Sequence, residues 1–152
     1  MKIFNKKTAP FFLSAVFLFI LDRFLKYFSL KYFFGKDLFL ISDFFKFSFA
    51  ENEGIAFSIP INQNILIFLI VIIILFILFF LFKLNKKKSF GEIFALTIIL
   101  FGAVSNLIDR LFYGSVIDYF NLKYFTIFNL ADVMIFCGVI FIMILNYRDI
   151  KN

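Results

Sequence analysis

Between Ile65 and Phe82 the chain reads ILIFLIVIIILFILFFLF, eighteen residues without a charged or polar side chain. The polar residues Asn62, Gln63 and Asn64 precede this run, and Lys83 follows it. A helix of roughly 20 apolar residues crosses the hydrocarbon core of a bilayer, which is about 30 Å thick. The run therefore predicts a transmembrane helix over about residues 65–82.

The composition of the whole chain agrees with a membrane location. Of 152 residues, 63% are hydrophobic and 17% are charged, whereas a globular protein is about 45–50% apolar. A soluble domain of this length cannot bury such an excess. We expect one integral membrane domain comprising residues 1–152.

Three further apolar segments are long enough to span if a few polar groups are accepted: about 10–30, 93–113 and 128–145. The first follows a Lys-rich start and could be read as a secretory signal peptide, but no small-residue cleavage site follows it. The sequence thus predicts an all-α integral membrane protein, a bundle of four transmembrane helices.

The basic residues orient this bundle. Nine of the sixteen lie in the N-terminal tail, the connection between the second and third spans, and the C-terminal tail: Lys2, Lys6, Lys7, Lys83, Lys86, Lys87, Lys88, Arg148 and Lys151. Cytoplasmic loops carry the excess of Lys and Arg, so both termini are expected in the cytoplasm. Because these charges lie close to spans, a nucleic-acid partner is not expected.

The first outer segment, about residues 31–64, is too long for a simple turn. Phe45–Phe49 alternates polar and apolar residues with the period of a half-buried strand. Glu51–Gly54 has turn composition, and Ile55–Ile59 could pair back as a second strand. We expect a small extracytoplasmic β-element on the helical bundle.

The residue types that are missing restrict the chemistry. The chain has no His, no Trp and a single Cys, Cys137, which we expect to be a small core residue. Ser-His-Asp triads, Cys-His dyads and Cys/His metal sites are therefore excluded within this chain. No metal and no cofactor is expected.

Charged groups in or beside spans are expensive and are usually paired or functional. Asp22 and Lys26, spaced i and i+4, are expected to form a structural charge pair. Asn106, Asp109 and Arg110 share a helix face, and Asp109 and Arg110 could satisfy each other.

Two acids, Asp118 and Asp132, have no obvious local cation and flank one short outer connection. Asn129 could cap the last helix with Asp132 in its first turn, which would be a purely structural role. Two carboxylates in a semi-dry site cannot both ionise comfortably, so one can hold a proton while the other activates water. This reasoning favours an aspartate dyad that hydrolyses a peptide bond.

Two other functions remain open at this point. A non-enzymatic transport or assembly subunit could use intramembrane Asp and Lys residues to relay protons or pair with partner helices, and it would tolerate Asp118→Asn. Another type of intramembrane aspartic protease would hold its acids deep within two spans, whereas Asp118 and Asp132 lie at span ends.

Four blocks in order resemble the bacterial lipoprotein signal peptidases, also called type II or prolipoprotein signal peptidases. The blocks are Leu21–Lys26, Asn52–Ser58, Asn106–Tyr119 and Phe128–Asp132. The chain departs from the usual family pattern at two residues: Ser105 occupies a position that is commonly Gly, and Arg23 a position that is commonly polar and neutral.

The resemblance implies an aspartic endopeptidase in the bacterial cytoplasmic (inner) membrane, with its site at the extracytoplasmic face. Asp118 and Asp132 would be catalytic, and Asp22 and Lys26 structural. The substrate would be a prolipoprotein carrying a diacylglyceryl-Cys, cleaved just before that Cys; membrane lipids would be the other partners of an expected monomer. Residues that would line or support the site are Asn52, Gly54, Asn106, Arg110 and Asn129.

Overall fold

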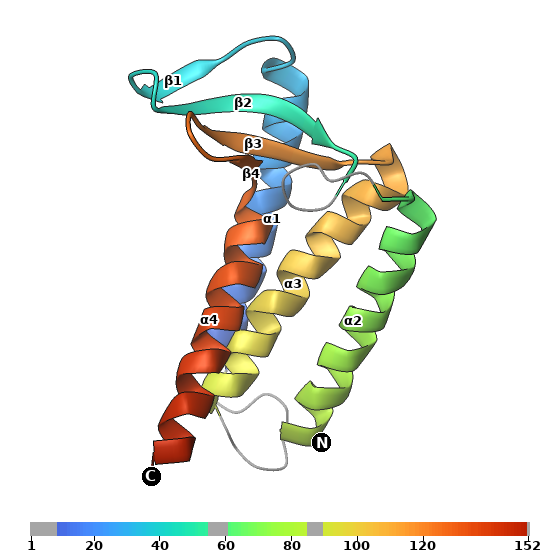
Figure 1. The fold of residues 1–152 in the computed structure, drawn as a ribbon, viewed down its shortest axis with the longest axis vertical. Helices are drawn as coiled ribbons and strands as arrows, with labels where there is room; N and C mark the ends of the chain where they lie inside the picture. Colours follow the sequence, from blue (N-terminus) through green and yellow to red (C-terminus); the bar gives the residue numbers. More distant parts are fainter. Residues whose placement is uncertain (1–8, 55–60, 85–89, 152) are drawn as a thin grey trace.

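The computed structural model describes residues 9–54, 61–84 and 90–151 of the chain. In this part of the chain, long helices stand side by side beneath a small sheet (Figure 1). The helices are α1 (Ala9–Tyr32), α2 (Gln63–Leu84), α3 (Phe90–Tyr113) and α4 (Leu130–Lys151). The strands are β1 (Leu38–Ile41), β2 (Phe45–Asn52), β3 (Val116–Leu122) and β4 (Ile127–Phe128).

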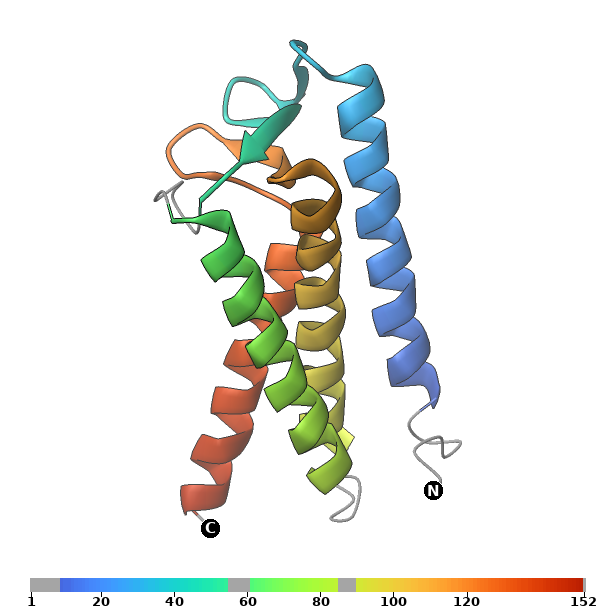
Figure 2. The same ribbon diagram turned by 90° about the vertical axis from the view of Figure 1, so that its right-hand side faces the viewer.

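The α3 helix is the centre of the bundle, since it packs against α1, α2 and α4. Figure 2 shows α1 and α2 on different sides of α3, with the first turn of α1 and the last turn of α4 at the end away from the sheet. The sheet therefore covers only one end of the bundle.

Three helices are long and apolar enough to cross a membrane, judged by length and composition within the described residues: Gln63–Lys83, Phe90–Tyr113 and Leu130–Arg148. They correspond to the predicted spans at about 65–82, 93–113 and 128–145. The α1 helix matches the predicted segment at 10–30 in extent but carries Asp22, Arg23 and Lys26, and it is not among these three.

The sheet is antiparallel throughout, in the order β1-β2-β3-β4. The predicted strand at Phe45–Phe49 lies within β2, which continues through Glu51 and Asn52, so the turn begins later than its composition suggested. The partners of β2 are β1 and β3. The second strand predicted at 55–59 falls outside the described residues.

Close packing of α3 on α4 fixes the start of α4. A Cβ added at Gly102 would lie 2.6 Å from the backbone oxygen of Ala131 and 2.9 Å from Ile135, so only glycine permits this approach. Asn106 is one helical turn beyond Gly102 on α3, and Asp132 follows Ala131 on α4. The crossing thereby brings both polar side chains to the same level of the bundle.

The α3 helix ends at Tyr113, and Gly114 follows with a φ of +81°. This left-handed conformation is the usual helix terminator and suits glycine. The chain turns there and enters β3, which runs back across the end of the bundle beside β2. The site residue Asp118 therefore lies on a strand and not in an irregular connection.

The expectation that Cys137 is a core residue is wrong. Its side chain is exposed on the outside of α4. Ile140 and Ile144, which follow Cys137 on the same helix face, are 40% and 49% exposed, so this face of α4 presents an apolar surface outward, as a span facing lipid would.

Candidate active site

Asp118 lies in β3, opposite Ala50 of β2, and its side chain is only 2% exposed. The amide nitrogen of Asn52 donates a hydrogen bond to Asp118 Oδ2 at 3.2 Å. The Asn52 side-chain oxygen in turn accepts from the backbone N–H of Gly54 at 3.1 Å. The turn after β2 thus orients an amide donor toward the carboxylate.

Asp132 lies in the first turn of α4 and forms a reciprocal cap with Asn129. The backbone N–H of Asp132 donates to Asn129 Oδ1 at 2.8 Å, and the backbone N–H of Asn129 donates to Asp132 Oδ2 at 3.2 Å. This is the pattern of a capping box, in which two otherwise unpaired donors are satisfied. The helix N-terminus also favours a carboxylate at this position.

Asn129 connects the two acids. While its oxygen caps α4, its Nδ2 donates to Asp118 Oδ1 at 2.6 Å. Asn129 is fully buried, so this link is shielded from solvent. The structure therefore brings Asp118 and Asp132, which the sequence analysis named as a pair, to the two sides of one asparagine.

The protonation of Asp118 reflects opposing effects. Burial, and next the negative charge of Asp132, raise the pKa of Asp118 to about 7, against the lowering effect of the amide donors of Asn52 and Asn129. Desolvation and a like charge both disfavour the ionised carboxyl. Asp118 therefore exchanges its proton near neutral pH.

Asn106 joins Asp132 to the charged groups of α1. Its Nδ2 donates to Asp132 Oδ1 at 2.8 Å, and its Oδ1 accepts from Lys26 Nζ at 2.7 Å. Asn129 Nδ2 also lies 3.3 Å from Asn106 Oδ1. The asparagine at 106 therefore contacts a cation on one side and an acid on the other.

Lys26 is the centre of a buried charge cluster. Its Nζ lies 3.3 Å from Asp22 Oδ2 and 2.7 Å from Asp109 Oδ2, and all three side chains are fully buried. Arg23 adds an ion pair to the other oxygen of Asp109. The expected pair of Asp22 and Lys26 is thus part of a larger group containing two acids and two cations.

The idea that Asp109 and Arg110 satisfy each other is wrong. Neighbouring residues on a helix point in different directions, and Asp109 faces α1 whereas Arg110 faces the turn after β2. The Arg110 guanidinium donates to the backbone oxygen of Gly54 at 2.5 Å and to that of Glu53 at 3.5 Å. Arg110 therefore holds the turn that orients Asn52.

The two departures from the family pattern contact each other. Arg23 donates to the backbone oxygen of Ser105 at 3.2 Å and to its hydroxyl oxygen at 3.4 Å. The Ser105 hydroxyl donates to Asp22 Oδ2 at 2.6 Å. Ser105 thus adds a hydrogen bond to Asp22, and Arg23 adds one to Asp109.

Sequence reasoning did not single out Tyr119. Its hydroxyl donates to Asp22 Oδ1 at 2.8 Å and accepts from the backbone N–H of Leu130, the first residue of α4, at 2.9 Å. Asp22 Oδ1 also accepts from the N–H of Ala131 at 3.1 Å. A tyrosine directly beside Asp118 in an apolar stretch was the available signal, because a buried Tyr hydroxyl usually needs a partner.

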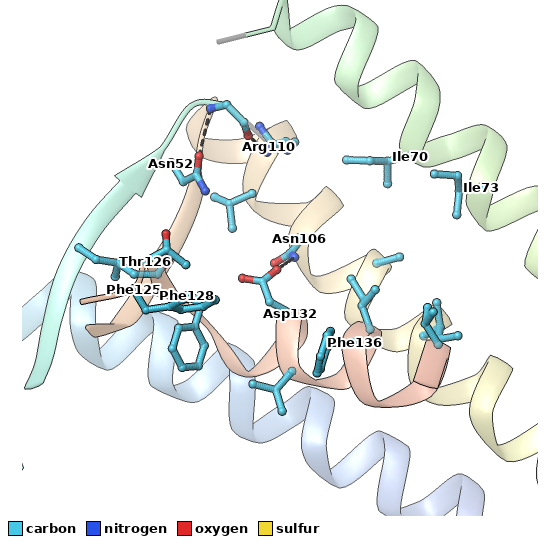
Figure 3. A pocket seen from close by; sticks show the side chains of 18 of the residues that line it. Asn52, Ile70, Ile73, Asn106, Arg110, Phe125, Thr126, Phe128, Asp132 and Phe136 are labelled. Carbon is cyan, nitrogen blue, oxygen red and sulfur yellow. Dashed lines mark hydrogen bonds between the residues drawn. The ribbon is translucent and has the colours of Figure 1, made fainter. Parts of the chain in front are cut away.

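A cavity of about 710 Å³ opens beside these groups. Asn52, Asn106, Arg110 and Asp132 line one end of it, and Ile70 and Ile73 of α2 face it from the opposite side (Figure 3). Its remaining lining is mainly apolar, from α3, α4 and the end of the sheet. Asp132 is one of the lining residues, whereas Asp118 is not.

Such a cavity can hold an apolar ligand with a few oriented polar groups at one end. Within the described residues, no group of three or more His, Cys, Asp or Glu side chains could hold a metal ion. The groups that line the polar end are the Asp132 carboxyl, the amides of Asn52 and Asn106, and the Arg110 guanidinium. Asp118 and Asn129 lie next to this lining, hydrogen-bonded to Asn52 and Asn106 respectively.

Residues 14–148 match the protein family described as signal peptidase (SPase) II. This chain belongs to the signal peptidase II family. The family description names a peptidase, in agreement with the resemblance found in the sequence.

Individual members of the signal peptidase II family match over most of their length. The chain is 40% identical over 136 residues to a lipoprotein signal peptidase of Clostridium tetani, covering 86% of this chain and 87% of that protein. It is 36% identical to a lipoprotein signal peptidase of Brevibacillus brevis, covering 93% and 97% of the two chains. The fold is similar to a solved bacterial membrane enzyme with a TM-score of 0.81 and 29% identity, covering 95% of this chain and 91% of the other.

Proposed function

We propose that this protein is an aspartic endopeptidase that cleaves the signal peptide from diacylglyceryl-modified prolipoproteins, just before the lipidated Cys. The observation that carries the proposal is Asn129, which donates to Asp118 at 2.6 Å and caps the turn that contains Asp132. The names of the relatives supply the substrate class, since they are lipoprotein signal peptidases.

In the proposed reaction Asp132 is the base, because it lines the cavity where water and peptide meet. Asp132 takes a proton from a water molecule as the water oxygen bonds to the peptide carbonyl carbon. Asp118, whose pKa of about 7 keeps a proton available, gives that proton to the developing oxyanion. Stabilising this charge in a dry site lowers the barrier substantially.

The intermediate then collapses. The C–N bond breaks, the departing nitrogen of the Cys takes the proton from Asp132, and Asp118 recovers its proton from the carbonyl-derived hydroxyl. The Asn52 amide, which lines the cavity and bonds Asp118, gives way as the carbonyl oxygen approaches that carboxyl. Asn106, Arg110, Asn129 and Gly54 support this arrangement.

The apolar part of the cavity suits the diacylglyceryl group. Acyl chains would lie among Ile70 and Ile73 of α2 and Phe136 and Val139 of α4, while the peptide backbone lies at the polar end. A lipid-anchored substrate would approach laterally from the bilayer, between helices.

We further infer that residues 1–152 form one membrane domain in which α1 is a fourth span. With four spans, the excess of Lys in the predicted inner segments places both termini in the cytoplasm. The sheet and the site then lie at the extracytoplasmic face of the cytoplasmic membrane, and the enzyme acts as a monomer without a metal or cofactor.

The test uses purified full-length protein in detergent with a diacylglyceryl-modified prolipoprotein. Asp118→Asn and Asp132→Asn should each abolish cleavage while the protein stays folded. Asp43→Asn is the matched control, since it makes the same change at an exposed acid whose carboxylate lies 3.8 Å from Lys123; it should cleave normally. Cleavage by both dyad variants would contradict the proposal.

A further inference from the structure

Lys26 makes more polar contacts than a charge pair on one helix requires. Its ammonium group contacts side chains of two acids and one amide, on α1 and α3, and it is fully buried. Burying an ammonium costs several kcal/mol before its partners compensate. Charge neutralisation explains the contacts of Lys26 with the two acids, but it does not explain the contact with the neutral Asn106 amide.

This contact is the shorter of two that orient the Asn106 amide: Asn106 Oδ1 accepts from Lys26 Nζ at 2.7 Å and from Asn129 Nδ2 at 3.3 Å. Lysine carries only donors, so the end of the amide that faces Lys26 must be the oxygen. The NH₂ end then faces Asp132 and donates to Oδ1 at 2.8 Å. With the amide reversed, its oxygen would face a carboxylate and its NH₂ would face an ammonium, so both hydrogen bonds would be lost.

The acids around Lys26 are themselves held in place. Asp22 accepts from Ser105, Tyr119 and Ala131. Asp109 accepts from the backbone N–H of Ile117, which precedes Asp118, at 3.2 Å. Lys26 therefore has little freedom to leave its position beside Asn106.

We infer that Lys26 is a positioning residue for the peptidase reaction: it fixes the orientation of the Asn106 amide, which in turn holds the Asp132 carboxylate toward the cavity. Lys26 is buried and does not line the cavity, whereas Asn106 and Asp132 do, so its contact with the dyad runs through Asn106. The inference rests on the proposed function, since it assigns a role relative to the dyad.

The test is a double-mutant cycle measured with the lipidated substrate. Lys26→Met removes the donor with little change in length, and it should lower kcat roughly 10- to 100-fold, the scale of a misplaced reacting group. KM should not change, because Lys26 does not contact the cavity. Asn106→Ala should lower kcat similarly, and the double variant should be no worse than Asn106→Ala alone, since contacting residues in one chain of interactions are not additive.

Arg23→Met is the matched control. It removes a cation from the same cluster, but Arg23 contacts Asp109 and Ser105 and not Asn106. Thermal stability should fall, while kcat stays within about twofold of wild type. A purely structural role for the cluster predicts instead that Lys26→Met and Arg23→Met alter kcat alike.

A charge-balanced variant keeps the test decisive if Lys26→Met does not fold. Asp22→Asn combined with Lys26→Met leaves Arg23 paired with Asp109, and Asp22→Asn alone is its reference. The inference would be overturned if the Asp22→Asn, Lys26→Met double variant had the same kcat as Asp22→Asn alone. It would also be overturned if the fold-losses in kcat from Lys26→Met and Asn106→Ala multiplied in their double variant. If Asp118→Asn or Asp132→Asn still cleaved, the proposed function would fail instead, so the two failures are distinguishable.

Discussion

Asn129 caps α4 and donates a hydrogen bond to Asp118, and the substitution Asn129→Ser separates these two roles. A serine at a helix N-cap still accepts a hydrogen bond from the backbone of the first turn, so the cap of α4 should survive. Its side chain is too short to replace the 2.6 Å bond from Asn129 Nδ2 to Asp118 Oδ1. The substitution thus removes a donor from Asp118 and leaves the start of α4 intact.

The expected shift in the pKa of Asp118 follows from the loss of that hydrogen bond. A hydrogen bond to a charged group contributes about 1.5–3 kcal/mol, and one pKa unit corresponds to about 1.4 kcal/mol. Because the lost donor favoured the ionised form, the pKa of Asp118 should rise from about 7 by roughly one to two units. The charges that also act on Asp118, those of Asp132, Lys26 and Arg110, are unchanged in the variant.

The assay is the pH dependence of kcat/KM. In the proposed reaction Asp118 must be protonated, so kcat/KM should fall at high pH as Asp118 ionises; this fall is the basic limb of the pH profile. Because Asp118 and Asp132 interact, the limb reports a titration of the pair. The variant should hold its activity to a pH roughly one to two units higher than wild type. Asn129→Ala is the comparison, because it should shift the same limb and also destabilise α4. An unmoved basic limb in Asn129→Ser would refute the reasoning.

Two further outcomes test the packing and the burial of charge. Gly102→Ala should lower thermal stability and cleavage, because its Cβ would lie 2.6 Å from a backbone oxygen of α4; Gly91→Ala is the control, since the atom met there is the mobile end of Leu145 at 3.0 Å. Asp118→Asn should stabilise the inactive protein: the pKa of Asp118 is raised to about 7 in the folded state, so wild type loses stability as pH rises from about 4 to 7, by up to about 4 kcal/mol. The gain in thermal midpoint should be absent at pH 4, grow to pH 7 and then stay level; a gain that is the same at all pH values would contradict the burial argument.

Hydrophobic pattern sufficed to locate the long helices. The uncharged run at Ile65–Phe82 corresponds to α2, and its polar neighbour Asn62 accepts from the N–H of Asn64 as an N-cap residue. The cap of α4 by Asn129 could also be foreseen, because the N-cap and the third helical residue are close in sequence. Local signals therefore predicted the long helices and the cap of α4.

Partners distant in sequence could not be foreseen. Nothing near Asp109 indicates that its cations are Lys26 and Arg23, more than eighty residues earlier. The strand character of Val116–Leu122 was hidden because four successive residues, Val116–Tyr119, are buried. A strand enclosed on both faces does not alternate, so it resembles any short apolar run.

The ion pair between buried Lys26 and Asp109 of α3 has a consequence for the order of biosynthesis. A ribosome delivers α1 to the membrane well before it has made Asp109, so Arg23 and Lys26 at first have one acid, Asp22, between them. A lone helix with this surplus cation is a poor span. For α1 as the proposed fourth span, we expect secure insertion only after α3 has been made, so that the first helix to be synthesised is one of the later ones to insert stably.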